Sequence, residues 1–279
     1  MTFSFRSGGN TLAGDLTLPA GPGPYRCVVF VEGSGPGGRD LGGWPARLAA
    51  DGIASLAYDK PGSGASTGDW TAQSLPDRAR ETLAAVAAVR DRLPGSPVGL
   101  IGHSQGGWVA WLAAVSPLVS AVVTLSAPGV GVLAQEEHRL RHQLPPEAVP
   151  LGLSLLHAQV DRVRAGEDPA VVAADQRRWA GEPWFPLLSG TSAATIGFLA
   201  RIAGHDPLPG LADVRCPMLA VYGADDTFLP VDESVSRLAG VETVVFPGAD
   251  HGLRDPDGTR VPGFDALLAG WLTERLVLS

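Results

Sequence analysis

Hydrophobic residues along this chain fall into short runs separated by glycine- and proline-rich turns. Residues 2–18 alternate apolar and polar positions around a turn at residues 7–10, which predicts an antiparallel hairpin. Further along, continuous apolar runs predict strands that are buried on both faces of a sheet. The predicted buried strands are residues 27–31, 53–58, 97–101, 121–125, 217–222 and 241–246.

Apolar residues at helical spacing occupy most intervals between these runs. In residues 75–93, for example, Leu83 and Val86 lie on one helical face, and Ser74 can cap the first turn. The predicted helices are residues 44–50, 75–93, 108–115, 232–239 and 262–277. Because strand and helix alternate from residue 27 to residue 128, we expect an α/β fold whose mostly parallel central sheet is flanked by helices on both faces.

The alternation of strand and helix is interrupted between residues 129 and 212. This segment shows helical patterns broken by prolines and no convincing strand, and the strand pattern resumes after it. We therefore expect residues 1–128 and 213–279 to form one core domain. Residues 129–212 are expected to form a helical cap insertion over the carboxyl ends of the strands.

Ser104 is the candidate nucleophile because it lies in a G-x-S-x-G motif between a predicted strand and a predicted helix. This arrangement is typical of a nucleophile elbow, a strained turn that raises the serine hydroxyl into a cleft. Gly102 and Gly106 supply the space, since a side chain at either position would crowd the facing backbone. The alternative is an ordinary serine in a glycine-rich loop, because glycine accounts for 36 of the 279 residues. The strand–turn–helix context favours the elbow.

A serine hydroxyl needs a general base, and the base needs an acid that fixes its tautomer. At elbows of this kind the chain order is serine, then acid, then histidine. Asp225 and Asp226 follow the predicted strand at residues 217–222, and His251 follows the predicted strand at residues 241–246. His251 is the only histidine after these acids, so it is the candidate base. Either aspartate can supply the acid, and the other interpretation of each is a carboxylate that stabilises its own loop.

A glycine-rich segment at residues 32–40 leaves the end of the predicted strand at residues 27–31. Glycine lets backbone N–H groups approach a ligand closely. In acyl-transfer enzymes with an elbow, one oxyanion donor comes from such a loop, and the second is the N–H that follows the nucleophile. We therefore expect the N–H groups of Ser34 and Gln105 to form the oxyanion hole, the alternative being a flexible turn.

Charge and composition exclude several classes of partner. The net charge is −8 and the chain contains no basic run, which argues against nucleic-acid and anionic-membrane partners. The N-terminus lacks a signal-peptide pattern and no window of about 18 apolar residues occurs, so we expect no membrane span and a cytoplasmic location.

Cys27 and Cys216 are expected to be small buried residues and not to form a disulfide. His138 and His142 have metal-binding spacing but no third ligand, so we expect no metal and no cofactor.

With an elbow, an acid and a histidine in this order, the chain resembles the α/β-hydrolase superfamily over nearly all residues outside 129–212. The loop Gly33-Ser34-Gly35-Pro36, followed by Arg39-Asp40, resembles the oxyanion loop of a branch of bacterial serine esterases with dienelactone-hydrolase-like neighbours. The later loop Tyr58-Asp59-Lys60 is similar to another loop of that branch. The resemblance implies the α/β-hydrolase fold, with an N-terminal β-hairpin and a helical cap insertion.

The acid and histidine loops also resemble those of the superfamily. Residues 223–230 carry its Gly-x-x-Asp-x-x-Leu-Pro pattern, which implies that Asp226 rather than Asp225 is the acid. Residues 248–252 carry its Gly-x-x-His-Gly pattern, which implies that His251 is the base. The resemblance therefore implies a triad of Ser104, Asp226 and His251.

Two residues depart from the family's pattern. Pro61 replaces a common arginine, and Glu32 stands where the family usually has a histidine, which puts a carboxylate near the oxyanion hole. This carboxylate could be turned away and hydrogen-bonded, or it could raise the histidine pKa and bias the choice of substrate. Aromatic residues of the insertion could line the substrate pocket or pack in the core of the cap. The candidate pocket residues are Glu32, His103, Trp179, Trp184 and Phe185. His157, Phe198 and His205 of the insertion could also line the pocket.

The site residues and the resemblance imply a serine hydrolase that cleaves small-molecule carboxylic esters through an acyl-enzyme. Ser104 excludes dehalogenases and epoxide hydrolases, whose nucleophile is an aspartate. A thioesterase, a peptidase or a carbon–carbon bond hydrolase would use the same residues, and the arginines of residues 129–212 leave a CoA thioester open. A non-catalytic ligand-binding member of the fold is the alternative from another class, and the retention of all three triad residues argues against it.

Overall fold

A central sheet of eight strands organises the computed structural model, which describes residues 1–39 and 41–278. The strand order is β1-β2-β4-β3-β5-β6-β7-β8. The first two strands form the predicted antiparallel hairpin, β2 pairs antiparallel with β4, and β3 to β8 pair in parallel. The strands are β1 (Thr2–Ser7), β2 (Asn10–Thr17), β3 (Arg26–Val31), β4 (Ile53–Tyr58), β5 (Val98–His103), β6 (Val122–Leu125), β7 (Met218–Gly223) and β8 (Glu242–Phe246).

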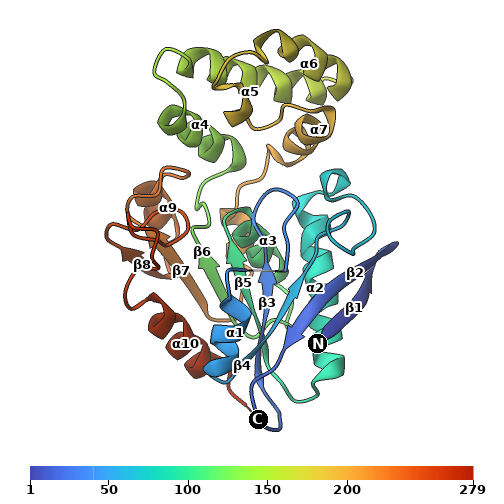
Figure 1. Cartoon of the computed structure of the whole chain (residues 1–279), viewed down its shortest axis with the longest axis vertical. Helices are drawn as coiled ribbons and strands as arrows, with labels where there is room; N and C mark the ends of the chain where they lie inside the picture. Colours follow the sequence, from blue (N-terminus) through green and yellow to red (C-terminus); the bar gives the residue numbers. More distant parts are fainter. Residues whose placement is uncertain (40, 279) are drawn as a thin grey trace.

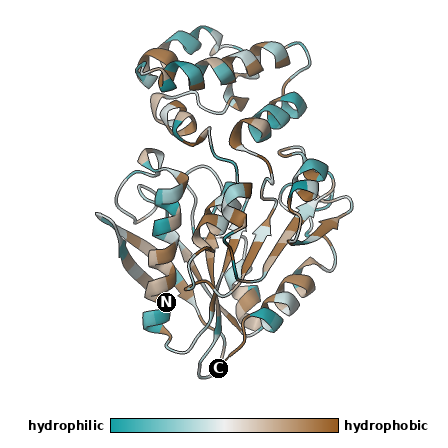
Figure 2. Cartoon of the chain, turned by 180° about the vertical axis from the view of Figure 1, so that it is seen from behind, coloured by the Kyte–Doolittle hydropathy of each residue, from teal (hydrophilic) through white to brown (hydrophobic). Residues whose placement is uncertain are grey.

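Helices cover both faces of this sheet (Figure 1). On one face, α1 (Trp44–Ala50) and α10 (Phe264–Arg275) enclose one hydrophobic cluster, and on the other face α2 (Leu75–Arg92) and α3 (Gln105–Ala113) enclose a second. Each inner strand contributes to both clusters, which is why its apolar run is continuous. Figure 2 shows the result, with apolar strands in the centre and polar outer faces on several helices.

The long helix α2 begins as predicted at Ser74, which forms a capping box with Asp77. The Ser74 hydroxyl accepts a hydrogen bond from the Asp77 N–H at 3.2 Å, and the Asp77 carboxylate accepts one from the Ser74 N–H at 2.8 Å. The box satisfies two backbone donors that have no partner inside the helix. It thereby fixes the start of a helix whose inner face packs against α3 and the sheet.

Residues 129–212 contain helices and no strand in the part of the chain that the structure describes. Four of these helices lie beyond the carboxyl ends of the strands (Figure 1), and we call α4 to α7 the cap helices. Nowhere in residues 1–39 and 41–278 is a helix long and apolar enough to cross a bilayer. The remaining helices are η1 (Trp70–Ala72), α4 (Val132–Gln143), α5 (Val149–Arg164), α6 (Pro169–Gln176), η2 (Arg177–Trp179), η3 (Phe185–Leu187), α7 (Ala193–Ile202), α8 (Leu208–Leu211) and α9 (Val231–Arg237).

Candidate active site

Ser104 lies on a sharp turn between β5 and α3 with backbone angles φ 51° and ψ −125°. A positive φ is uncommon for a residue with a side chain and indicates a strained position held by its surroundings. The surroundings leave no space beside the turn. A Cβ atom on Gly102 would lie 2.5 Å from the carbonyl oxygen of Gly106, and one on Gly106 would lie 2.0 Å from that of Val31. Both glycines are therefore required by close backbone contacts, and the turn has the geometry of an elbow.

His251 and Asp226 form a short hydrogen-bonded pair beside this turn. The Nδ1 atom of His251 lies 2.7 Å from Oδ2 of Asp226, whose side chain is buried. The other carboxylate oxygen of Asp226 accepts the N–H of Phe228 at 2.7 Å. Asp225 is exposed and holds its loop through a backbone bond to Ala249. Of the two candidate acids, the structure therefore pairs Asp226 with the histidine.

Two aromatic rings hold the imidazole of His251. The ring of Phe228 stacks on it at a centroid distance of 4.6 Å, and the ring of His103 lies at 5.0 Å. The Nε2–H of His103 donates to the backbone carbonyl of His251 at 3.2 Å. Burial, and secondarily the neighbouring His251, lowers the pKa of His103 to about 4. His103 is therefore neutral near pH 7 and supports the histidine loop by a hydrogen bond.

Ser104 lies where two cavities meet. The first, which we call the core-side cavity, has a volume of about 530 Å³ and includes Ser104 and His251 in its wall. The second, which we call the cap-side cavity, has a volume of about 590 Å³ and extends toward the cap helices. Ser34, Ser104 and Phe228 belong to both walls. A ligand at Ser104 can therefore extend in two directions.

The loop that contains Ser34 is fastened from beneath by a buried lysine. Lys60 Nζ donates to the carbonyl oxygen of Gly33 and, at 2.6 Å, to that of Gly35. The N–H groups of Ser34 and Gln105 donate no hydrogen bond to another described residue. Both residues line the cap-side cavity. Two free donors are thus available beside Ser104.

Charged side chains are buried beneath this loop. Burial and the nearby Arg78 lower the pKa of Lys60, whereas Glu32 and Glu81 oppose this shift. Burial raises the pKa of Glu32, whose Oε2 accepts the N–H of Gly38 at 2.7 Å. Of the two expectations for Glu32, the hydrogen-bonded one is observed, although the residue also lines the core-side cavity. The carboxylate therefore helps to shape the loop.

Arg78 is a functional-site residue that the sequence analysis missed. Its guanidinium donates to the side-chain oxygen of Gln105 at 3.1 Å and to the backbone carbonyl of Glu32 at 3.0 Å. It thereby connects the helix after the turn at Ser104 to the start of the loop that contains Ser34. The sequence contained a signal that Arg78 is buried, because Arg78 lies on the same helical face as Leu75 and Thr82, which are buried.

Lys60 was also missed as a residue that supports the site, although it is the one lysine in a sequence with many arginines.

Three of the four aromatic candidates from the insertion, Trp179, Trp184 and Phe185, do not line either cavity at Ser104, and this part of the prediction is wrong. Trp184 and Phe185 are buried in the hydrophobic cluster among the cap helices, and Trp179 lies at a separate cavity beside α5 and α6. Large apolar rings gain more from the packed interior of the helices than from a wet cavity wall. Asp40, which the sequence resemblance includes in the loop that contains Ser34, lies outside the described residues.

Phe198, the fourth aromatic candidate of the insertion, does line the cap-side cavity, together with Trp70 and Trp108, which the sequence did not indicate. Within residues 1–39 and 41–278, no three His, Cys, Asp or Glu side chains are grouped so that they could hold a metal ion.

Known proteins show similarity to this chain in sequence. A model of the alpha/beta hydrolase family matches residues 28–260. Esterase EstD of Thermotoga maritima is 27% identical over 195 residues, which cover 59% of this chain and 47% of that protein. The chain thus spans about half the length of this curated relative.

Solved structures extend the similarity to the whole fold. A hypothetical protein of Pseudomonas aeruginosa, PA2218, has a TM-score of 0.67 at 22% identity, covering 99% of this chain and 93% of that one. Est1E from Butyrivibrio proteoclasticus, solved with ferulic acid bound, has a TM-score of 0.62 at 19% identity, covering 98% and 96%. At such low sequence identities these solved structures establish only the fold of the chain. The family model matches most of the sequence and therefore establishes the family. The chain belongs to the alpha/beta hydrolase family.

Proposed function

We propose that this protein is a serine hydrolase that cleaves carboxylic esters of small molecules through an acyl-enzyme. The observation that carries the proposal is the 2.7 Å pair of His251 and Asp226 beside a strained Ser104, with His251 and Ser104 in the wall of one cavity. Esterase EstD, a sequence relative, supports an ester as the substrate.

In the proposed reaction, Ser104 Oγ attacks the acyl carbon while Nε2 of His251 takes the hydroxyl proton. Nε2 is available because Nδ1 is bonded to Asp226. The carbonyl oxygen becomes an oxyanion, which accepts hydrogen bonds from the N–H groups of Ser34 and Gln105. Each donor contributes about 3 kcal/mol to the stability of the transition state.

The tetrahedral intermediate then collapses. His251 returns its proton to the leaving alcohol oxygen as the bond to the acyl carbon breaks. Water, deprotonated by the same imidazole, attacks the acyl-enzyme and releases the acid. Asp226 keeps the imidazole in the required tautomer and stabilises its charged form, and its burial makes that interaction strong.

We propose that residues 129–212 act as the cap of this site, because cap helices supply much of the wall of the cap-side cavity. The charged residues in this wall are Glu136 and Arg139, which form an ion pair at 2.9 Å. Arg139 is fully engaged by neighbouring acceptors and offers no free cation for a phosphate group.

Hydrolysis of p-nitrophenyl esters from acetate to palmitate tests the proposal, with Ser104→Ala as the control. We expect turnover that is lost in the variant, and we expect a fluorophosphonate probe to label the wild type at Ser104. An enzyme that neither hydrolyses any of these esters nor reacts with the probe would contradict the proposal. Labelling without ester turnover would move the substrate to a thioester, a peptide or a carbon–carbon bond.

A further inference from the structure

The two cavities at Ser104 differ in which triad residue they contact. His251 belongs to the wall of the core-side cavity. The described residues that form the wall of the cap-side cavity do not include His251. Because the imidazole must protonate the leaving oxygen, the alcohol group of an ester has to lie within its reach. If Ser104 is the nucleophile proposed above, the alcohol occupies the core-side cavity and the acyl group the cap-side cavity.

The core-side cavity is suited to an apolar alcohol. Aromatic and aliphatic side chains from both sides of the elbow make up much of its wall, where Phe30 and Trp44 contact each other edge to face. Such walls favour apolar groups, and an aromatic leaving group can pack against these rings. The apolar residues of the wall are Phe30, Val31, Leu41, Trp44, Ile101, Leu125, Phe228 and Leu253.

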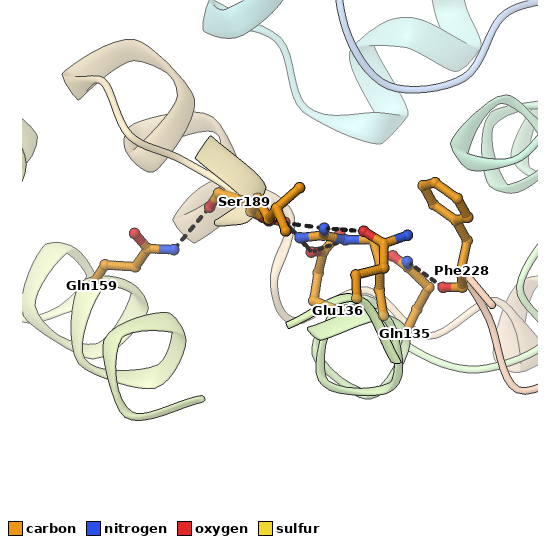
Figure 3. Close-up of polar contacts among 8 residues, drawn as sticks. Gln135, Glu136, Gln159, Ser189 and Phe228 are labelled. Atoms are coloured by element: carbon orange, nitrogen blue, oxygen red, sulfur yellow. Dashed lines mark hydrogen bonds and ion pairs between the residues drawn. The ribbon is translucent and has the colours of Figure 1, made fainter. Parts of the chain in front are cut away.

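The wall of the cap-side cavity contains a polar cluster (Figure 3). It is built by α4 and by the segment after η3, which are both distant from Ser104 in the sequence. Arg139 is the centre of this cluster. Its Nε and Nη2 donate to Oε2 of Glu136 at 3.2 and 2.9 Å, and Nη2 also donates to the hydroxyl of Ser189. Its Nη1 donates to Oε1 of Gln143 at 3.0 Å and to the backbone carbonyl of Leu187 at 2.8 Å. All five guanidinium donors are therefore in use.

Two residues of this cluster, Glu136 and Gln143, line the cavity and keep unused hydrogen-bonding capacity. Oε1 of Glu136 accepts no hydrogen bond from a described residue, and the side-chain nitrogen of Gln143 donates none to a described residue. The first is an acceptor and the second a donor. Because Glu136 is neutralised by Arg139, neither a free cation nor a free anion is favoured here, since it would lose hydration without gaining a net counter-charge.

We infer that the acyl group of the substrate ends in a neutral polar group that both donates and accepts hydrogen bonds, such as a primary carboxamide or a hydroxyl. Its N–H or O–H donates to Glu136, and its oxygen accepts from Gln143. The substrate is then an ester of an apolar alcohol with an acid that carries this polar end group. This inference rests on the proposed function of Ser104.

The experiment holds p-nitrophenol constant as the leaving group and changes the end of the acyl chain. The probes are the p-nitrophenyl esters of adipamic, pimelamic and suberamic acid. Each is compared with the ester in which an isopropyl group replaces the terminal carboxamide, so that shape and length are matched. At the best chain length, we expect kcat/KM for the carboxamide to exceed that of its isostere by about tenfold, the effect of hydrogen bonds that the isostere leaves unmade.

Variants connect this preference to the polar cluster. We expect Gln143→Leu and Glu136→Gln each to reduce the carboxamide preference to about one. Glu137→Gln is the matched control, because Glu137 is adjacent on α4 but pairs with His157 and does not line the cavity. The control is expected to keep the preference of the wild type.

The outcomes separate this inference from the proposed function. If the wild type hydrolyses these esters in a Ser104-dependent way but treats the carboxamide and its isostere equally, or prefers the isostere, the inference is overturned and the esterase proposal stands. A preference that survives in both Gln143→Leu and Glu136→Gln also overturns it. If no ester is hydrolysed and the fluorophosphonate probe does not react, both proposals fall together.

Discussion

The side-chain amine of Lys60 holds the loop that carries Ser34. It donates to the carbonyl oxygens of Gly33 and Gly35, one on each side of that serine. These bonds orient the intervening peptides and therefore determine where the Ser34 N–H points. The burial that lowers the pKa of Lys60 is opposed by the carboxylate of Glu32, so the two groups depend on each other.

Replacement of Lys60 by methionine removes these bonds while keeping an unbranched chain. We expect Lys60→Met to lower kcat/KM for p-nitrophenyl acetate by about a hundredfold, as when one oxyanion donor is lost. The reduction should be mainly in kcat, because the donor acts in the transition state. Arg80→Met is the control, since Arg80 is an exposed cation on α2. A folded Lys60→Met variant with wild-type kcat/KM would refute the role of this lysine.

His103 makes folding stability depend on pH in the acid range. Its pKa is lowered to about 4 in the folded protein, and the ordinary value is 6.5. Between these values the unfolded chain binds a proton that the folded chain does not, so stability falls as the pH is lowered from about 6.5 to 4. At about 1.4 kcal/mol per pKa unit the full shift corresponds to about 3.5 kcal/mol, of which roughly 2–3 kcal/mol is lost between pH 6.5 and pH 4.

Urea unfolding of the wild type and His103→Gln at pH 7, 5.5 and 4.5 checks this prediction. Glutamine does not titrate, so the variant should lose roughly 2 kcal/mol less stability over this range than the wild type. Burial also lowers the pKa of His138 and His205, so part of the decline is expected to remain in the variant. Identical declines in the two proteins would show that His103 does not contribute.

At the level of elements, helix α4 is joined directly to the acid loop. The side-chain nitrogen of Gln135 on α4 donates to the backbone carbonyl of Phe228 at 2.8 Å, as Figure 3 shows. The same Phe228 stacks on His251 and donates its N–H to Asp226. Phe228 therefore contacts both helix α4 and the imidazole of His251, so a shift of α4 would change the position of the imidazole through this one residue.

Truncation of Phe228 should loosen the imidazole. We expect Phe228→Ala to lower kcat about tenfold, because the ring of His251 loses the aromatic face that orients it and excludes water. Gln135→Ala should act in the same direction but less strongly, since it removes only the hydrogen bond behind Phe228. Val245→Ala is the matched control, because Val245 is 39% exposed and Phe228 is 40% exposed. An equal loss of kcat in the control would indicate a general effect on stability.

On the scale of the whole molecule, the cap helices contact the core at a second place. The rings of Trp70 and Phe198 meet edge to face at 5.1 Å, and Arg201 on α7 donates to the backbone carbonyl of Thr71 at 2.7 Å. Trp70 and Phe198, like Gln135 and Phe228, line the cap-side cavity, so both contacts belong to its wall. A change at either contact should therefore alter the shape of this cavity.

Removal of the second contact should make the proposed cap easier to digest. We expect the double variant Trp70→Ala with Arg201→Ala to be cleaved within residues 129–212 by thermolysin about tenfold faster than the wild type, because local opening requires less free energy. Mass spectrometry of the fragments identifies the sites. Arg162→Ala breaks an exposed ion pair inside the cap and serves as the control. Unchanged cleavage in the double variant would mean that the contact does not hold the cap closed.

The sequence predicted the sheet and its helices because the apolar runs are long and regular. It also indicated Ser104 and His251 as candidates, because the elbow motif and the order of strand ends restrict the choice. The wall of the cap-side cavity was not predictable, since it depends on how helices far apart in sequence pack. Trp184 and Phe198 look alike as sequence, yet only Phe198 lines the cavity. Arg78 was missed because a buried arginine needs partners that are distant in the sequence.

The burial of Lys60 has a consequence for chemical labelling. Lys60 carries the only side-chain amine of this chain, and it is only 2% exposed. Apart from the α-amino group, amine-reactive reagents should therefore find no target in the native protein. Modification of Lys60 requires the loop at Gly33 and Gly35 to open, so the rate at which an amine reagent attaches to this side chain reports the opening of that one loop.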